Sequence, residues 1–168
     1  MAALYHLSAK VGKVSPVAHD DYIERSEKFS KYQKAEELLY SKSMNMPSWA
    51  DKGRDFLEAT AQYEKRLPYR EWEIALPNEL FLKDNIKLVE GFIGERLKNK
   101  HACTYAIHKS KGKLSGQDNV HVHIMFSERE IDSRKDIPKE IYFKQYSKKK
   151  SGELTGGFRK NRQLHDKK

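Results

Sequence analysis

The sequence predicts an α+β fold, in which helices pack on a central antiparallel or mixed β-sheet in a sandwich of two or three layers. Strand-like segments with period-two alternation are separated by longer segments in which apolar residues recur every three or four positions, as in amphipathic helices. Late in the chain, two strand-like segments follow each other across a turn-rich connector, KGKLSGQD, which predicts a β-hairpin. The length of 168 residues suits one domain.

The first half of the chain predicts one strand and two helices. The strand covers residues 3–11, and the glycine and proline of GKVSPV end it. Charged and apolar residues at helical spacing predict a helix from Ala18 to about Tyr40. After a loop, SMNMPSW, a second helix is predicted over residues 48–66, capped by Ser48 with Asp51 at the third helical position.

The second half predicts a strand, a helix and the hairpin. The strand YREWEIALP ends at Pro77, and the segment 78–100 predicts a helix. One side of that helix is apolar: Leu88, Val89, Phe92, Ile93 and Leu97. The strands ACTYAIHKS and NVHVHIMFSE form the hairpin. The chain then becomes rich in lysine and glycine, and we expect a flexible basic extension over 147–168, after a domain of residues 1–146.

The charge and cysteine content narrow the class of protein. Lysine and arginine exceed aspartate and glutamate by nine. A basic surface favours a polyanionic partner such as nucleic acid, although the same charge also serves solubility. A single cysteine, Cys103, excludes a disulfide or a thiolate zinc cluster within one chain. No apolar segment approaches the ~20 residues of a membrane span, so we expect a cytoplasmic protein without membrane insertion.

The histidines of the hairpin predict a metal site. His121 and His123 are two residues apart, so in a strand their side chains share one face. His108 ends the preceding strand and can join them across the antiparallel pair. Three histidines on adjacent strands leave coordination positions open, which is typical of a catalytic metal. Imidazoles suit manganese or zinc better than magnesium, and such an ion can polarise a phosphoryl oxygen. The alternative is ordinary strand histidines without a metal.

Five segments in this order resemble a known family: YHLSAK, DDYIERSEKF, YREWEIALP, YAIHK and NVHVHIMFSER. They are similar to the relaxase domain of MobA/MobL plasmid mobilisation proteins, which are HUH endonucleases. The resemblance implies an HUH relaxase-like fold, a nucleophilic Tyr22, and active-site carboxylates Glu71 and Glu73. It assigns His108, His121 and His123 to a divalent ion, Mn2+ or Mg2+, with Zn2+ as a further candidate.

The activity implied by this resemblance is metal-dependent nicking of one DNA strand at a plasmid origin of transfer. Tyrosine attack would form a 5′-phosphotyrosine intermediate that can be rejoined, for conjugative mobilisation. The implied partners are single-stranded or supercoiled plasmid DNA, accessory relaxosome proteins and a type IV secretion coupling protein, in a bacterial cytoplasm. Two alternatives stay open: a rolling-circle replication initiator of the same superfamily, and a non-catalytic basic nucleic-acid-binding module.

Several basic residues are expected to contact the DNA backbone. They are Lys10, Lys13, Arg25, Lys109, Lys111 and Lys144. Near the last of these, the aromatic rings of Tyr142, Phe143 and Tyr146 are expected to stack on bases, with a solvated tail as the alternative for this lysine-rich end. His6, His19 and His101 have no partners by spacing and are predicted to be structural or surface residues.

Overall fold

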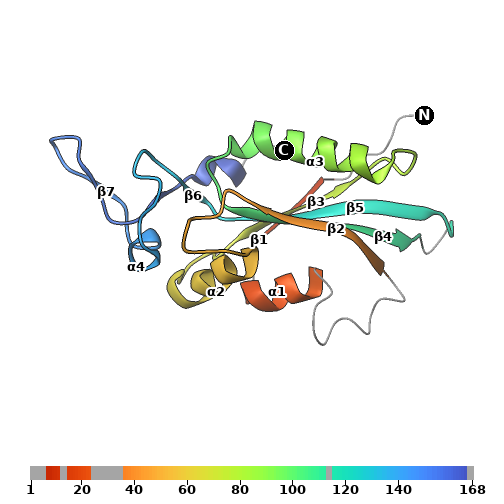
Figure 1. Ribbon diagram of the computed structural model, residues 1–168, viewed down its shortest axis with the longest axis horizontal. Coiled ribbons are helices and arrows are strands. Elements are labelled where there is room, and N and C mark those ends of the chain that lie inside the picture. Colours follow the sequence, from red (N-terminus) through yellow and green to blue (C-terminus); the bar gives the residue numbers. More distant parts are fainter. Residues whose placement is uncertain (1–6, 12–14, 24–35, 113–114, 166–168) are drawn as a thin grey trace.

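A five-stranded antiparallel sheet forms the centre of the computed structural model, which describes residues 7–11, 15–23, 36–112 and 115–165 (Figure 1). The strand order across the sheet is β1-β3-β5-β4-β2. The strands are β1 (Leu7–Val11), β2 (Glu36–Met44), β3 (Arg70–Ala75), β4 (Cys103–Lys111) and β5 (Asp118–Phe126). The predicted α+β class and the β4–β5 hairpin are confirmed.

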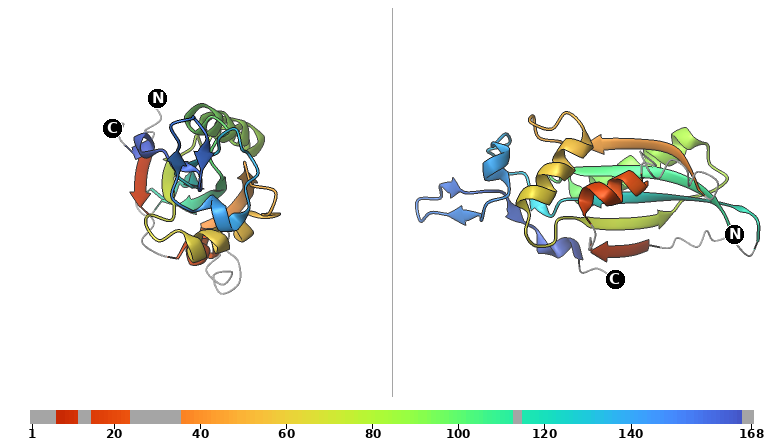
Figure 2. Two further views of the ribbon diagram at one scale, coloured as in Figure 1. Left: turned by 90° about the vertical axis from the view of Figure 1, so that its left-hand side faces the viewer. Right: turned by 90° about the horizontal axis from the view of Figure 1, so that it is seen from below.

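Helices cover both faces of this sheet. The helices α1 (Pro16–Ile23) and α2 (Gly53–Tyr63) lie on one face, and α3 (Leu82–Leu97) lies on the other (Figure 1). Seen from below, α1 and α2 lie side by side across the strands (Figure 2). Among the helices of the described residues, none is long and apolar enough to cross a membrane.

Strand alternation divides the core between the two faces. Ile107, Val122 and Ile124 pack with the buried side of α3, where Val89 and Ile93 lie. The alternate residues of β4 and β5 face α1 and α2, and that is the face that receives the histidines. Leu88 is predicted on the apolar side of α3 with Val89 and Ile93, but it is 45% exposed, whereas those two residues are buried.

Two predicted elements differ from the structure. Of the helix expected over 18–40, residues 18–23 are helical in α1, residues 24–35 lie outside the described part, and residues 36–40 belong to β2, which pairs along its length with β4. A register shift between Leu38 and Tyr40 interrupts the alternation that would have revealed this edge strand. The helix expected from Ser48 begins at Gly53, after the N-cap residue Lys52.

The start of α2 also uses a different cap from the one predicted. The Asp55 carboxylate accepts a hydrogen bond from the Lys52 backbone N–H at 2.8 Å. The Ser48 backbone N–H instead donates to the Asp136 side chain at 3.1 Å. Ser48 therefore fixes the loop before α2 and does not begin the helix.

The chain after β5 forms short elements, and part of it packs on α2, while residues 147–153 are exposed and the flexibility expected over 147–168 stays a prediction. It contains α4 (Lys139–Tyr142), a 3-10 helix (Arg162–His165), and four short strands. These are β6 (Arg129–Glu130), β7 (Ser147–Lys148), β8 (Leu154–Thr155) and β9 (Arg159–Lys160). Phe158 is fully buried and packs against Tyr142, with ring centroids 4.9 Å apart. Because Tyr142 and Phe143 are buried, they cannot stack on bases, which corrects that prediction.

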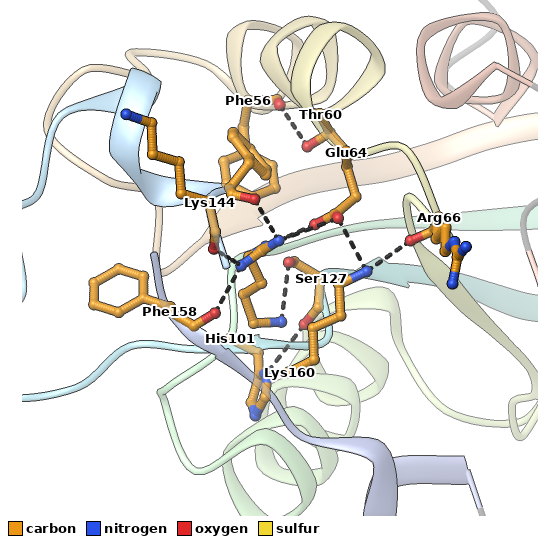
Figure 3. Close-up of polar contacts among 11 residues, drawn as sticks. Phe56, Thr60, Glu64, Arg66, His101, Ser127, Lys144, Phe158 and Lys160 are labelled. Atoms are coloured by element: carbon orange, nitrogen blue, oxygen red, sulfur yellow. Dashed lines mark hydrogen bonds and ion pairs between the residues drawn. The ribbon is translucent and has the colours of Figure 1, made fainter. Parts of the chain in front are cut away.

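A buried arginine joins this segment to α2. Arg129 is 5% exposed, and its guanidinium donates two hydrogen bonds to the Glu64 carboxylate at 2.6 and 3.1 Å. It also donates to the backbone carbonyls of Phe143, Lys144 and Phe158, at 2.6, 3.0 and 2.7 Å. Figure 3 shows Glu64, Lys144 and Phe158 around this guanidinium. Five charge-assisted donors therefore tie three stretches of chain together.

Two glycines let the same segment pass close to α4. Gly156 has a φ of +73°, which L side chains rarely adopt. A Cβ at Gly157 would overlap with the carbonyl oxygens of Tyr142 and Lys144. Only glycine at position 157 allows this backbone-to-backbone contact.

Candidate active site

Three buried imidazoles converge on the sheet face that carries α1 and α2. His108 of β4 lies directly opposite His121 of β5, and His123 follows two residues later on the same side. The ring centroids are 5.6 Å apart for His108 and His121, 5.1 Å for His108 and His123, and 5.2 Å for His121 and His123. All three side chains are nearly inaccessible to solvent. The strand pairing therefore brings the predicted histidines together.

A carboxylate that sequence reasoning missed approaches two of these rings. Glu36 is the first residue of β2, the strand that borders β4. Its carboxylate lies 2.6 Å from His121 Nε2 and 3.6 Å from His108 Nδ1. The sequence pattern assigned Glu36 to a helix, so its proximity to the histidines became visible only once β2 was recognised as the neighbour of β4.

Glu71 supports the third imidazole from the other side. It lies on β3, whose register places Glu73 opposite His123 and Glu71 opposite Met125. His123 Nδ1–H donates to the Glu71 carboxylate at 2.7 Å. This bond fixes the tautomer of His123 and leaves the Nε2 lone pair for a cation. Glu73 lies near both residues, since the candidate ligand atoms of Glu71, Glu73 and His123 are within 4.8 Å of one another.

The charge states of this pair follow from burial and hydrogen bonding. Burial by itself would raise the pKa of the Glu71 carboxyl, but the hydrogen bonds from His123 and His19 outweigh it and lower that pKa to about 2. Burial lowers the pKa of His123, against the opposing effect of Glu71. Glu71 is therefore ionised and His123 is neutral near pH 7, which is the state in which an imidazole binds a metal.

His19 also belongs to this site, although it was predicted to be structural or a surface residue. Its Nε2–H donates to the second Glu71 oxygen at 2.6 Å. Its ring stacks on Tyr69, with centroids 5.5 Å apart and an angle of 18° between the planes. The sequence held one signal for this role, since His19 stands three residues before Tyr22. His101, in contrast, is buried away from the site, where its Nδ1 bonds to the Ser127 carbonyl at 2.9 Å.

Tyr22 belongs to α1, on the face of the sheet where the imidazoles lie. Its side chain is outside the described part of the structure.

The predicted DNA-contacting residues are spread over the molecule. Lys13 and Arg25 lie outside the described residues, as does the side chain of Lys10 on β1. At the hairpin end of the sheet, Lys109 Nζ lies 3.4 Å from the Glu37 carboxylate, and Lys111 pairs with Asp118. Lys144 follows α4, at the opposite end of the sheet from this hairpin (Figure 1).

The residues present fit a divalent cation. Glu36, His108, His121 and His123 each offer one ligand atom, and these atoms lie within 4.8 Å of one another. Three imidazoles and one carboxylate form a donor set that suits manganese or zinc. The bond between Glu71 and His123 adds the outer hydrogen bond that metal-binding histidines usually make.

Comparisons with known proteins assign the chain to a family and agree with this fold. The MobA/MobL family model matches residues 13–168, and the chain belongs to that family. The chain is 41% identical to the 43 kDa relaxation protein of Salmonella typhimurium over 151 residues, which cover 88% of this chain and 40% of that protein. It is 34% identical to mobilization protein A of Escherichia coli over 154 residues, which cover 88% of this chain and 21% of that protein.

A solved structure shares the fold. It comes from work on the molecular basis of vancomycin resistance transfer in Staphylococcus aureus. The two structures superpose with a TM-score of 0.60 and 25% sequence identity, over 81% of this chain and 76% of the other. The chain thus spans less than half the length of the two curated relatives, but most of the solved domain.

Proposed function

We propose that this chain is the DNA-nicking domain of a plasmid mobilisation relaxase, which cuts and rejoins one strand at an origin of transfer. Membership of the MobA/MobL family and the names of its relatives, a relaxation protein and a mobilization protein, support this role. The observation that carries the proposal is the convergence of three buried imidazoles on the sheet face that also bears α1, the helix of Tyr22.

Tyr22 is the proposed nucleophile. Its phenolic oxygen would attack the scissile phosphorus, and the bond from phosphorus to the 3′ oxygen would break. The products are a 5′-phosphotyrosine ester and a free 3′-hydroxyl, which takes up the phenolic proton. Because one phosphoester replaces another, the step is reversible and the strand can be rejoined. The phenol has an ordinary pKa near 10, so its attack needs electrostatic help at neutral pH.

His108, His121 and His123 would hold a divalent ion, Mn2+ or Mg2+, with Zn2+ as a further candidate, and Glu36 is within reach as a fourth ligand. Bound there, the ion supplies Lewis-acid stabilisation of negative charge on the phosphate. Glu71 would act through His123, because its hydrogen bond holds that ring with Nε2 available to the ion. Glu73 adds a second carboxylate beside this pair.

Lys109 and Lys111 are the described residues best placed to neutralise DNA phosphates, since both lie on β4 beyond His108. Their present partners, Glu37 and Asp118, form half-exposed or exposed ion pairs with them. Such pairs contribute little free energy, so a DNA phosphate can replace the carboxylate. Accessory relaxosome proteins and a secretion coupling protein remain expected partners of the whole protein.

The test is formation of a covalent DNA–protein adduct. The protein is mixed with Mn2+ and 3′-labelled single-stranded oligonucleotides tiled across a plasmid origin region, then run on a denaturing gel. We expect a labelled band that survives denaturation and disappears in Tyr22→Phe. The matched control is Tyr63→Phe, on α2 and stacked on Phe143, which should keep the band.

Two results would contradict the proposal. A non-catalytic binding module would retain labelled DNA on a native gel but give no covalent band with any oligonucleotide. A band that persists in Tyr22→Phe would show that another group attacks the phosphorus. The mapped 5′ end of the attached strand separates transfer from replication, because only a transfer role places it at the origin of transfer.

A further inference from the structure

A single buried carboxylate links two elements of the active site. Glu71, 3% exposed, accepts one hydrogen bond from His123 on β5 at 2.7 Å and another from His19 on α1 at 2.6 Å. The two donors reach different oxygens of the same carboxylate. One arm of this connection ends at the three-histidine cluster, and the other ends on the helix that carries Tyr22.

Because His19 lies on α1, its bond to Glu71 helps to determine how this helix is oriented on the sheet. The helix has only eight residues, so few backbone hydrogen bonds hold it, and its orientation depends on tertiary contacts. Residues three apart lie within one turn of a helix, so position 22 belongs to the same turn of α1 as His19. A bond at His19 therefore affects how this turn of α1 lies relative to β3.

We propose that His19 is a positioning residue, which docks the helix of the nucleophile onto Glu71 and thereby onto the histidine cluster. This inference rests on the proposed nicking function of Tyr22. The linked residues run from His19 through Glu71 to His123, across α1, β3 and β5. Backbone pairing holds β3 and β5 together, and the bond from His19 joins α1 to them.

The hydrogen bond, rather than packing of the ring, is the part of His19 that matters. A buried carboxylate needs donors, and a charge-assisted bond of 2.6 Å is of the strong kind. The stacking on Tyr69 keeps the ring in the plane from which Nε2 reaches Glu71. Two substitutions separate the contributions: His19→Gln keeps an N–H near the Nε2 position, and His19→Phe keeps the flat ring and loses the donor.

The experiment measures adduct formation in a single turnover, at saturating Mn2+ and saturating single-stranded DNA. We expect His19→Phe to slow the reaction by about 10- to 100-fold, which is the size of effect that a small misplacement of reacting groups produces. We expect His19→Gln to stay within about threefold of the unmodified protein, by retaining the donor. The Kd for DNA should change less than about twofold in both variants, because binding of the strand does not use this bond.

Three results would overturn the role of His19. Rates for His19→Phe that match the unmodified protein would show that the bond is dispensable. A slow His19→Gln beside a fast His19→Phe would assign the effect to stacking on Tyr69. A loss of DNA affinity that accounts for the whole rate change would make His19 a binding residue.

A separate readout distinguishes failure of this inference from failure of the nicking function. If the unmodified protein forms no adduct, the nicking role is refuted, but the docking of α1 can still be measured by amide hydrogen exchange. We expect exchange over residues 19–23 to accelerate by about tenfold in His19→Phe and to change little in His19→Gln. Equal exchange in the two variants would refute the docking role.

Discussion

Replacing Arg129 by methionine tests whether the packed segment after β5 depends on one buried guanidinium. Methionine keeps much of the length of the side chain and removes the five hydrogen bonds that the Arg129 guanidinium donates. The Glu64 carboxylate would lose its main partner, although Lys160 still lies 3.0 Å from it. The carbonyls of Phe143, Lys144 and Phe158 would lose their donor.

The magnitude follows from the burial of the pair. Side chains of Arg129 and Glu64 are 6% and 8% exposed. Removing one partner of a buried ion pair costs about 3–5 kcal/mol, and the remaining contact from Lys160 places the expected loss at about 3 kcal/mol. For a domain of this size each kcal/mol lowers Tm by about 2–4 °C, so we expect a decrease of about 6–12 °C.

Urea unfolding, followed by circular dichroism and tryptophan fluorescence, measures this loss. Trp49 reports on the segment itself, because its ring lies 5.5 Å from that of Tyr142 and 6.3 Å from that of Phe143. The control is Arg54→Met, which breaks the exposed ion pair with Glu58 within α2 and should cost less than about 0.5 kcal/mol. If Arg129→Met destabilises no more than this control, the guanidinium does not hold the segment in place.

Three further predictions concern stability. Gly157→Ala should lower the free energy of unfolding by several kcal/mol, because its Cβ would overlap three carbonyl oxygens. Gly94→Ala, in α3 with open space around it, should raise the free energy of unfolding by up to ~1 kcal/mol. Equal effects of the two variants in urea unfolding would contradict the close packing at Gly157. Hydrogen bonds, of which the one from Lys42 has the largest effect, lower the pKa of Glu90 below its ordinary 4.5. The ionised Glu90 therefore contributes about 1 kcal/mol to the free energy of unfolding above pH 4.5, and this contribution is lost as the pH falls through the lowered pKa. The stability gap between the unmodified protein and Glu90→Gln should therefore close on acidification, and a gap independent of pH would refute this. Mn2+ at 100 times its Kd should raise the free energy of unfolding by about 2.7 kcal/mol, and an undiminished rise in His121→Ala would exclude the histidine site.

Local patterns determined much of this protein. Alternation and helical spacing are patterns among residues close together in the sequence. They were enough to predict the α+β class, β3, α3 and the β4–β5 hairpin. The shared face of His121 and His123 follows from the geometry of any strand. The position of His108 opposite His121 needed only the pairing of two consecutive strands.

Other features were decided only by the tertiary structure. Glu36 reaches the histidines because β2 pairs with β4, which is not the next strand along the chain. The register shift interrupts the alternation of this edge strand, so its sequence pattern resembled that of a helix. His19 reaches Glu71 because α1 lies on one particular face of the sheet, which no local pattern specifies. The segment after Tyr146 is rich in lysine and glycine, which predicts flexibility when it is considered alone. Within it, the Phe158 carbonyl accepts a hydrogen bond from the buried Arg129 guanidinium, whose five hydrogen bonds go to four residues far apart in sequence and depend on the completed fold.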